Sequence, residues 1–147
     1  RKTYNLKPIK LPKKYFSDYV RGFFDGDGSF YIYNVNGVPQ IKCGFVAVSL
    51  QFIKKFNADL CKNLNVLEKA IHKNKDERSK RMIQYSICFY IEYAEKLEKF
   101  MYGNNPALYL DRKKEIFDQW KKIKRRHYIK KNYPSKIGWR LNQKVLA

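Results

Sequence analysis

The chain has 147 residues, of which 32 are Lys or Arg and 13 are Asp or Glu, so its formal net charge is +19. A chain of this length fits one domain with a buried core, and its evenly spread basic residues favour a phosphate polyanion as partner. Aromatic residues make up 16% of the chain and many lie in periodic apolar segments, which excludes a disordered basic tail. We therefore predict a folded nucleic-acid-binding protein with no membrane association, since no apolar run reaches spanning length and no signal peptide is apparent.

The three cysteines, Cys43, Cys61 and Cys88, lie in apolar contexts without a CxxC pair. This usage predicts buried free thiols and an intracellular, reducing compartment, and it argues against a structural zinc site. The sequence does not distinguish an organelle from a microbial cytoplasm, and it leaves open whether domains precede Arg1.

Residues 1–14 carry two prolines and six basic residues without periodicity. We predict a basic lead-in that is either a solvated linker or an arm that contacts phosphates. A helix should follow and end near Gly26 and Gly28, because apolar residues recur at three- and four-residue spacing at Phe16, Tyr19, Val20, Phe23 and Phe24.

Gly22 and Gly26 lie four residues apart on that helix and, with Tyr19, define a face that a second helix can approach closely. If the partner is a second copy, a two-fold axis would bring two Asp27 carboxylates together, and paired carboxylates bind divalent metal. The stretch from Asp25 to Ser29 is also ordinary turn chemistry. A calcium-binding loop is excluded, because its sixth position is Phe30 and its twelfth is Asn36.

Residues 29–34 alternate between apolar and polar, Asn36-Gly37 is a strong hairpin signal with Pro39 at its far edge, and residues 40–48 alternate again. The sequence predicts a two-stranded ribbon with one apolar face. The other face carries side chains able to hydrogen-bond base edges in the major groove, namely Ser29, Tyr31, Tyr33, Gln40 and Lys42.

Ser49 is a predicted N-cap for a helix that ends near residues 63–65. A second hairpin is expected from residues 66–73 and 81–90 around a charged tip, residues 73–80, which either contacts phosphates or only aids solubility. Its outward side chains should include His72, Gln84 and Ser86, with Met82 beside them. We interpret His72 as a solvated hairpin residue and not as a metal ligand.

A short helix around residues 94–101 should end at residues 103–106, followed by a longer helix with Asp111 as N-cap and a basic tail after His127. We predict a lead-in at 1–14, a domain at 15–128 and a tail at 129–147. The fold class is α+β, with a four-stranded antiparallel sheet whose apolar face is covered by helices and whose polar face can saddle a duplex.

The stretch Val20-Arg21-Gly22-Phe23-Phe24-Asp25-Gly26-Asp27-Gly28 resembles the motif that names the LAGLIDADG homing endonucleases. It keeps both glycines and both acids, while Arg21 stands where a small residue is usual. Together with an αββαββα order over residues 13–127, the resemblance implies the LAGLIDADG endonuclease fold. One copy of the motif implies a homodimer acting on double-stranded DNA at a near-palindromic site.

The resemblance also implies roles for particular residues. Asp27 would bind magnesium, which manganese or calcium can replace, with the carbonyl of Gly26 as a further ligand. Asp25 would be structural and bind backbone amides near the helix end. A basic residue at the start of the last helix, Arg112 or Lys113, would assist the leaving group, unless both lie on a solvated helix face.

The position expected to hold the water network, at the end of the second strand, is Ala47, which has no polar group. Either Ser49 or Gln51 fills this role or activity is weakened. The resemblance implies a magnesium-dependent, site-specific endonuclease encoded by a mobile element such as an intron or intein. The alternative is a non-cleaving binder on the same scaffold, either a maturase that binds intron RNA or a DNA-binding regulator; retention of both acids favours the nuclease.

Overall fold

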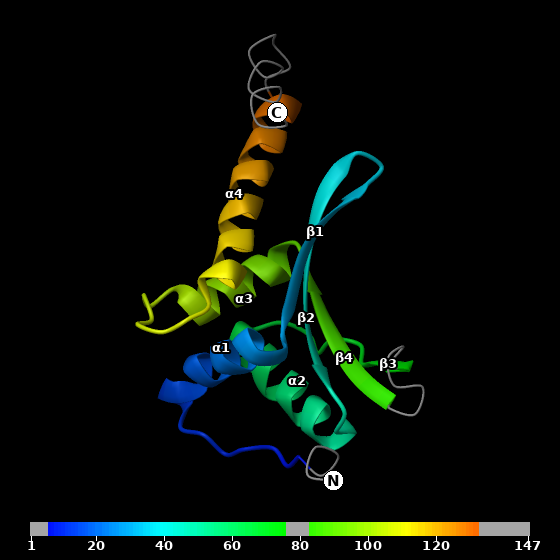
Figure 1. Ribbon diagram of the computed structural model, residues 1–147, viewed down its shortest axis with the longest axis vertical. Helices are drawn as coiled ribbons and strands as arrows, with labels where there is room; N and C mark the ends of the chain where they lie inside the picture. Colours follow the sequence, from blue (N-terminus) through cyan, green and yellow to red (C-terminus); the bar gives the residue numbers. More distant parts are fainter. Residues whose placement is uncertain (1–5, 76–82, 133–147) are drawn as a thin grey trace.

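The computed structural model describes residues 6–75 and 83–132 (Figure 1). The elements follow the predicted order of helix, hairpin, helix, hairpin, helix and helix. They are η2 (Lys13–Tyr15), α1 (Phe16–Asp27), β1 (Ser29–Val35), β2 (Val38–Ala47), α2 (Leu50–Leu64), β3 (His72–Lys75), β4 (Ile83–Tyr90), α3 (Glu92–Tyr102) and α4 (Asp111–Asn132). The predicted α+β class is confirmed.

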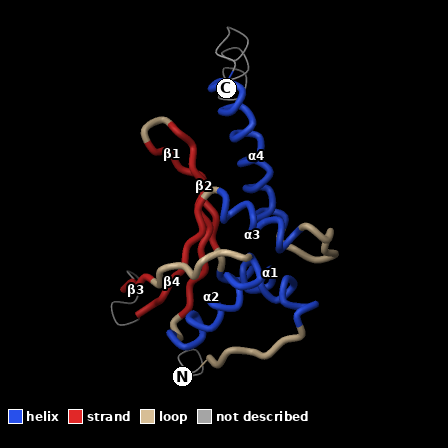
Figure 2. Tube along the Cα trace, turned by 180° about the vertical axis from the view of Figure 1, so that it is seen from behind, coloured by secondary structure: helices blue, strands red, loops and turns tan. Residues whose placement is uncertain are grey.

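The four strands form one antiparallel sheet in the order β1-β2-β4-β3. The helices lie on one side of this sheet and leave its other side uncovered (Figure 2). We call the uncovered side the outer face. The hairpin turn at Asn36-Gly37 has positive φ at both residues, 50° and 78°, as the two-residue turn requires, and it fixes the register of β1 on β2.

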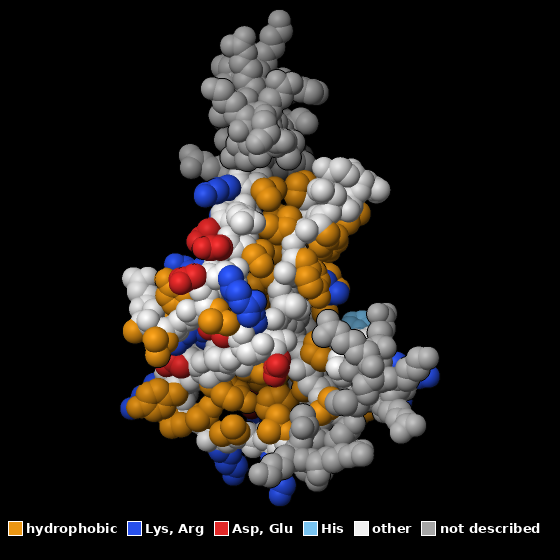
Figure 3. Space-filling model, in the orientation of Figure 1, with side chains coloured by type: hydrophobic (Ala, Val, Ile, Leu, Met, Phe, Trp, Pro, Cys, Tyr) orange, Lys and Arg blue, Asp and Glu red, His pale blue; other side chains and the backbone are white. Residues whose placement is uncertain are grey.

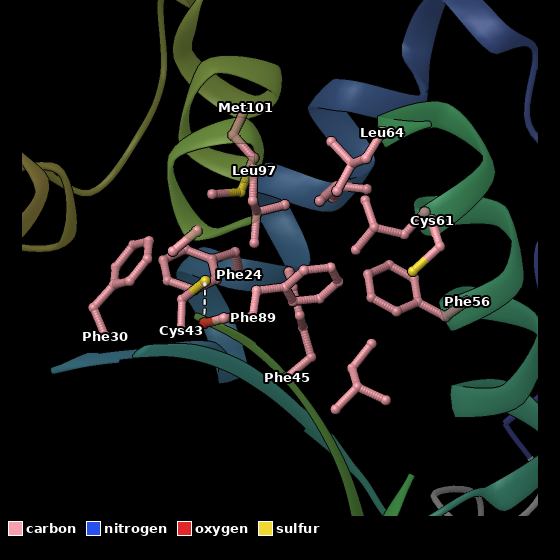
Figure 4. Packing of buried hydrophobic residues seen from close by; sticks show 14 of the residues in the cluster. Phe24, Phe30, Cys43, Phe45, Phe56, Cys61, Leu64, Phe89, Leu97 and Met101 are labelled. Carbon is pink, nitrogen blue, oxygen red and sulfur yellow. Dashed lines mark hydrogen bonds between the residues drawn. The ribbon is translucent and has the colours of Figure 1, made fainter. Parts of the chain in front are cut away.

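An aromatic core joins the sheet to the helices (Figure 4). Phe45 is fully buried at its centre, with its ring centroid 5.5 Å from that of Phe24 and 4.9 Å from that of Phe56. On the same strand the Cys43 thiol donates a hydrogen bond to the carbonyl of Phe89 at 3.7 Å. Burial of these rings fixes which strand residues face inward, and therefore which face outward.

Two predicted boundaries are wrong. The first strand of the second hairpin is His72–Lys75 and not residues 66–73, because the Asn57 side chain binds both the N–H and the carbonyl of Lys69 and ties that segment to α2. Residues 73–75 thus lie in β3 rather than in a loop, while residues 76–82 of the expected tip, with Met82, lie outside the described residues.

The last helix is also longer than predicted. Asp111 is its first helical residue and not its N-cap, and α4 continues to Asn132, past the predicted domain boundary at residue 128. Residues 124–132 contain no Gly or Pro and are rich in Lys and Arg, which favour helix even without an apolar stripe. None of the described helices is long and apolar enough to cross a bilayer.

Candidate functional site

The acidic motif lies where α1 passes into β1, at one end of the outer face. Asp27 is the last residue of α1 and its side chain is exposed. Gly28 then turns the chain into an extended conformation so tightly that a Cβ there would lie 2.3 Å from the Phe24 ring and 2.6 Å from the Phe24 carbonyl oxygen. Only glycine fits at that position, so the motif's last glycine sets where the exposed carboxylate stands.

Lys113 of α4 reaches the same helix end. Its ammonium donates to the carbonyl of Phe24 and, at 2.7 Å, to that of Gly28, and the residue is only 5% exposed. Burial and the Arg112 guanidinium lower the pKa of Lys113, while the carboxylates of Asp25 and Asp27 act in the opposite direction. A buried cation therefore lies at the negative end of the α1 dipole, within the electrostatic influence of Asp27.

Arg112 is exposed on α4, so of the two basic residues proposed for the leaving group only Lys113 is buried against the motif.

Asp25 has a structural role, as predicted. Asp25 Oδ2 accepts a hydrogen bond at 3.1 Å from the backbone N–H of Leu110, just before α4. The amide is 85 residues away rather than at the end of the same helix.

Arg21 also ties α1 to α3 and to the loop that precedes α4. Its guanidinium donates to the carbonyls of Met101 and Leu108 at 3.0 and 2.9 Å and pairs with Asp18 at 2.8 Å. The arginine is buried, and the sequence interpretation missed its role. Its signal was a lone cation within an apolar helical stretch, three residues after an acid.

Replacing Arg21 with Met should lower the free energy of unfolding by about 2 kcal/mol, because two partly buried carbonyls lose their donor while the apolar stem remains. Urea denaturation would measure it. Lys54→Met, at an exposed position on α2, is the matched control and should change stability far less. Equal stabilities for the two variants would contradict the anchoring role.

The oxygen donors at the α1 end suit a hard divalent cation. The Asp27 carboxylate is exposed, and the Gly26 carbonyl belongs to the last helical turn, whose carbonyls lack partners within the helix. Among the side chains that the structure describes, no group of three or more His, Cys, Asp or Glu could hold a metal. Magnesium is commonly bound by one or two carboxylates with water and substrate phosphates, so the donors fit that ion but form only part of a site.

The outer face is arranged in cross-strand rows. Tyr31 pairs with Lys42 and Tyr33 with Gln40, and Ser29 stands opposite Gly44 nearest the motif. The Lys42 ammonium lies 5.8 Å from the centroid of the Tyr31 ring and 5.7 Å from that of Tyr90. Burial acts to lower the pKa of Lys42, but Cys88, Tyr90 and Tyr31 outweigh it, and the raised pKa keeps the ammonium charged.

The second half of the outer face comes from β3 and β4. His72 stands opposite Ser86, and Asn74 stands opposite Gln84. Ser86 points outward as predicted but is 8% exposed, because the Asn74 amide donates to its hydroxyl at 3.0 Å. His72 and Asn74 are exposed.

Two side chains that the sequence analysis did not place on the outer face, Tyr90 and Cys88, also lie there. Continuing the alternation along β4 from Ser86 would have identified both. Cys88 is only half-buried, whereas the sequence predicted a buried thiol. Cys43 and Cys61 are buried, as predicted. No described residue of β1–β4 that points to this face is acidic, and basic side chains are spread widely over the surface seen in Figure 3.

The predicted helix–helix face is open. A Cβ at Gly22 or Gly26 would meet no atom within 4 Å. The two glycines line a groove of about 510 Å³ that loop residues Leu108, Tyr109 and Leu110 border. Tyr19 stands at the edge of this face, and its ring centroid lies 6.2 Å from that of Phe56. Burial raises the pKa of Tyr19.

None of the side chains considered for the water network is free and polar at the end of β2. Ala47 packs against the core. The Ser49 hydroxyl is buried, accepts the N–H of Phe52 as the predicted N-cap, and donates to the carbonyl of Leu6 at 3.0 Å. Gln51 is exposed in the first turn of α2.

No protein-family model matches the chain, and a search of curated proteins finds no match. Among solved structures, the chain is similar to a LAGLIDADG meganuclease, I-AabMI, crystallised bound to uncleaved DNA. The TM-score is 0.48 at 20% sequence identity, covering 83% of this chain and 40% of that protein. The chain thus spans less than half the length of this neighbour.

Proposed function

We propose that the chain is one subunit of a homodimeric, magnesium-dependent endonuclease that makes double-strand breaks at a long, near-palindromic DNA site. The observation that carries the proposal is the exposed Asp27 carboxylate beside buried Lys113, at the end of a sheet face whose described residues include no acidic side chain. The Lys113 ammonium is already bonded to two backbone carbonyls, so the exposed carboxylate still opposes binding of a polyanion unless a further cation accompanies it. A role in metal-assisted cleavage explains why a carboxylate lies at this place, whereas a role in nucleic-acid binding alone does not.

Asp27 and the Gly26 carbonyl would hold magnesium, together with phosphate oxygens and the Asp27 of a second copy. When bound, that ion would supply Lewis-acid chemistry that neutralises charge developing on the phosphate. The open Gly22 and Gly26 face supports close approach of a second α1.

Lys113 would donate a proton or a hydrogen bond to the leaving oxygen. An ammonium has three N–H groups, and two of them have acceptors among the described residues, the carbonyls of Phe24 and Gly28. The third is left for substrate, and the lowered pKa eases proton release.

The three free thiols support an intracellular, reducing compartment.

A second candidate function is binding without cleavage, by a maturase that takes intron RNA or by a DNA-binding regulator. The observation that favours it is the end of β2, where Ala47 is apolar and the Ser49 hydroxyl is already bonded.

Incubation of the protein with magnesium and a library of randomised duplexes, followed by sequencing of cut ends, distinguishes the candidates. We expect a single enriched site with two-fold symmetric ends, and a dimer by light scattering. Duplexes that are bound but never cut would contradict the nuclease and favour the binder. Asymmetric ends would contradict the homodimer but not the nuclease activity.

A further inference from the structure

Two valines at the tip of the β1–β2 hairpin are exposed without a structural reason. Val35 and Val38 form the last cross-strand pair before the Asn36-Gly37 turn and are 46% and 38% exposed. Among the described residues, neither belongs to the hydrophobic core or packs against it. The hairpin projects from the body of the molecule (Figure 1), and apolar side chains extend along it in the space-filling view (Figure 3).

The valine pair lies on the outer face. Residues two apart along a strand share a face, so Val35 and Val38 follow the Tyr33–Gln40 and Tyr31–Lys42 pairs in one row after another. The two-residue turn fixes their register, so their methyl groups are presented from a defined backbone. The outer face therefore changes from hydrogen-bonding groups near the motif to apolar groups at the tip.

The major groove of DNA offers one apolar group at its base edges, the C5 methyl of thymine. We propose, resting on the DNA-binding function above, that Val35 and Val38 recognise thymine methyl groups in the outer part of each half-site. Successive rows are about 6.6 to 6.8 Å apart, or about two base pairs of DNA. The thymines should therefore lie about four base pairs farther from the centre of the site than the base contacted by Lys42.

Replacing thymine by deoxyuridine removes this methyl group and leaves base pairing intact. Duplexes selected for binding in a chelator, where no metal-dependent cut occurs, would be synthesised with deoxyuridine at the outer thymines and their Kd measured by fluorescence anisotropy. We expect binding to weaken about fourfold per methyl group, the effect of one buried methylene. Deoxyuridine elsewhere in the duplex should have little effect.

The double variant Val35→Ser, Val38→Ser should bind thymine and deoxyuridine duplexes equally. Both positions are exposed, so the substitution should preserve folding, which circular dichroism would verify. Leu67→Ser, at an 86% exposed residue between α2 and β3, is the matched control and should retain the discrimination.

Selected sites without outer thymines, or equal affinity of the unmodified protein for both duplexes, would overturn this inference and leave DNA binding intact. A protein that selects no duplex at all would overturn both the inference and the proposed function.

Discussion

Replacing Asp27 with Asn should abolish DNA cleavage while DNA affinity stays unchanged or rises. The amide has nearly the same shape, but it removes the exposed carboxylate at the end of α1 and with it a negative charge near the phosphate. Loss of a single group that stabilises transition-state charge costs about 10² to 10³ in rate, and loss of a metal ligand should cost at least that much. Single-turnover cleavage of a selected duplex in magnesium and anisotropy in a chelator would measure the two quantities.

The matched control is Asp118→Asn, which removes one carboxylate from an exposed position on α4. It should leave the cleavage rate close to that of the unmodified protein. If Asp27→Asn cut as fast as this control, or lost DNA binding, the carboxylate would not have the role assigned to it.

Replacing Lys113 with Met should lower the cleavage rate by about a hundredfold or more, the usual contribution of a positioned proton donor. The apolar replacement can pack on the Phe24 ring, whose centroid lies 5.0 Å from the ammonium, so the fold should persist. Arg112→Met is the paired control, since that side chain is exposed on α4. Equal losses for the two variants would show that net positive charge, and not the buried ammonium, is what matters.

The pH dependence gives a second test of Lys113. Its pKa is lowered from 10.5 by burial, so the proton is lost at a lower pH than that of an ordinary lysine, and cleavage should fall on the alkaline side. Lys113→Arg should remove this fall, because a guanidinium does not titrate there.

Stability should move in the opposite direction. Since the unfolded state keeps this proton more strongly, the free energy of unfolding should rise with pH as pH approaches 10.5, and Lys113→Met should lack this rise.

If the alkaline fall in the cleavage rate persists in Lys113→Arg, a group other than Lys113 causes that fall.

Local sequence was sufficient wherever one element's own pattern decides its structure. The apolar spacing before Gly28 predicted α1, Asn36-Gly37 predicted the tight turn, and alternation predicted the rows that carry Tyr31, Tyr33, Gln40 and Lys42. It failed where distant contacts override that pattern. Asn57 ties residue 69 to α2 and shortens β3, although the local sequence favoured a longer strand.

The sequence by itself determined that a basic, folded chain presents an exposed acid between a helix and a polar strand. Only the tertiary structure showed that Lys113, and not Arg112, is buried against the motif, because this depends on which side chain of α4 meets carbonyls at the end of α1, 85 or more residues earlier. The same holds for Arg21, whose acceptors at Met101 and Leu108 lie 80 and 87 residues away. Periodicity reports which face of an element is buried, but a buried cation takes its function from its partners, and packing alone brings those together.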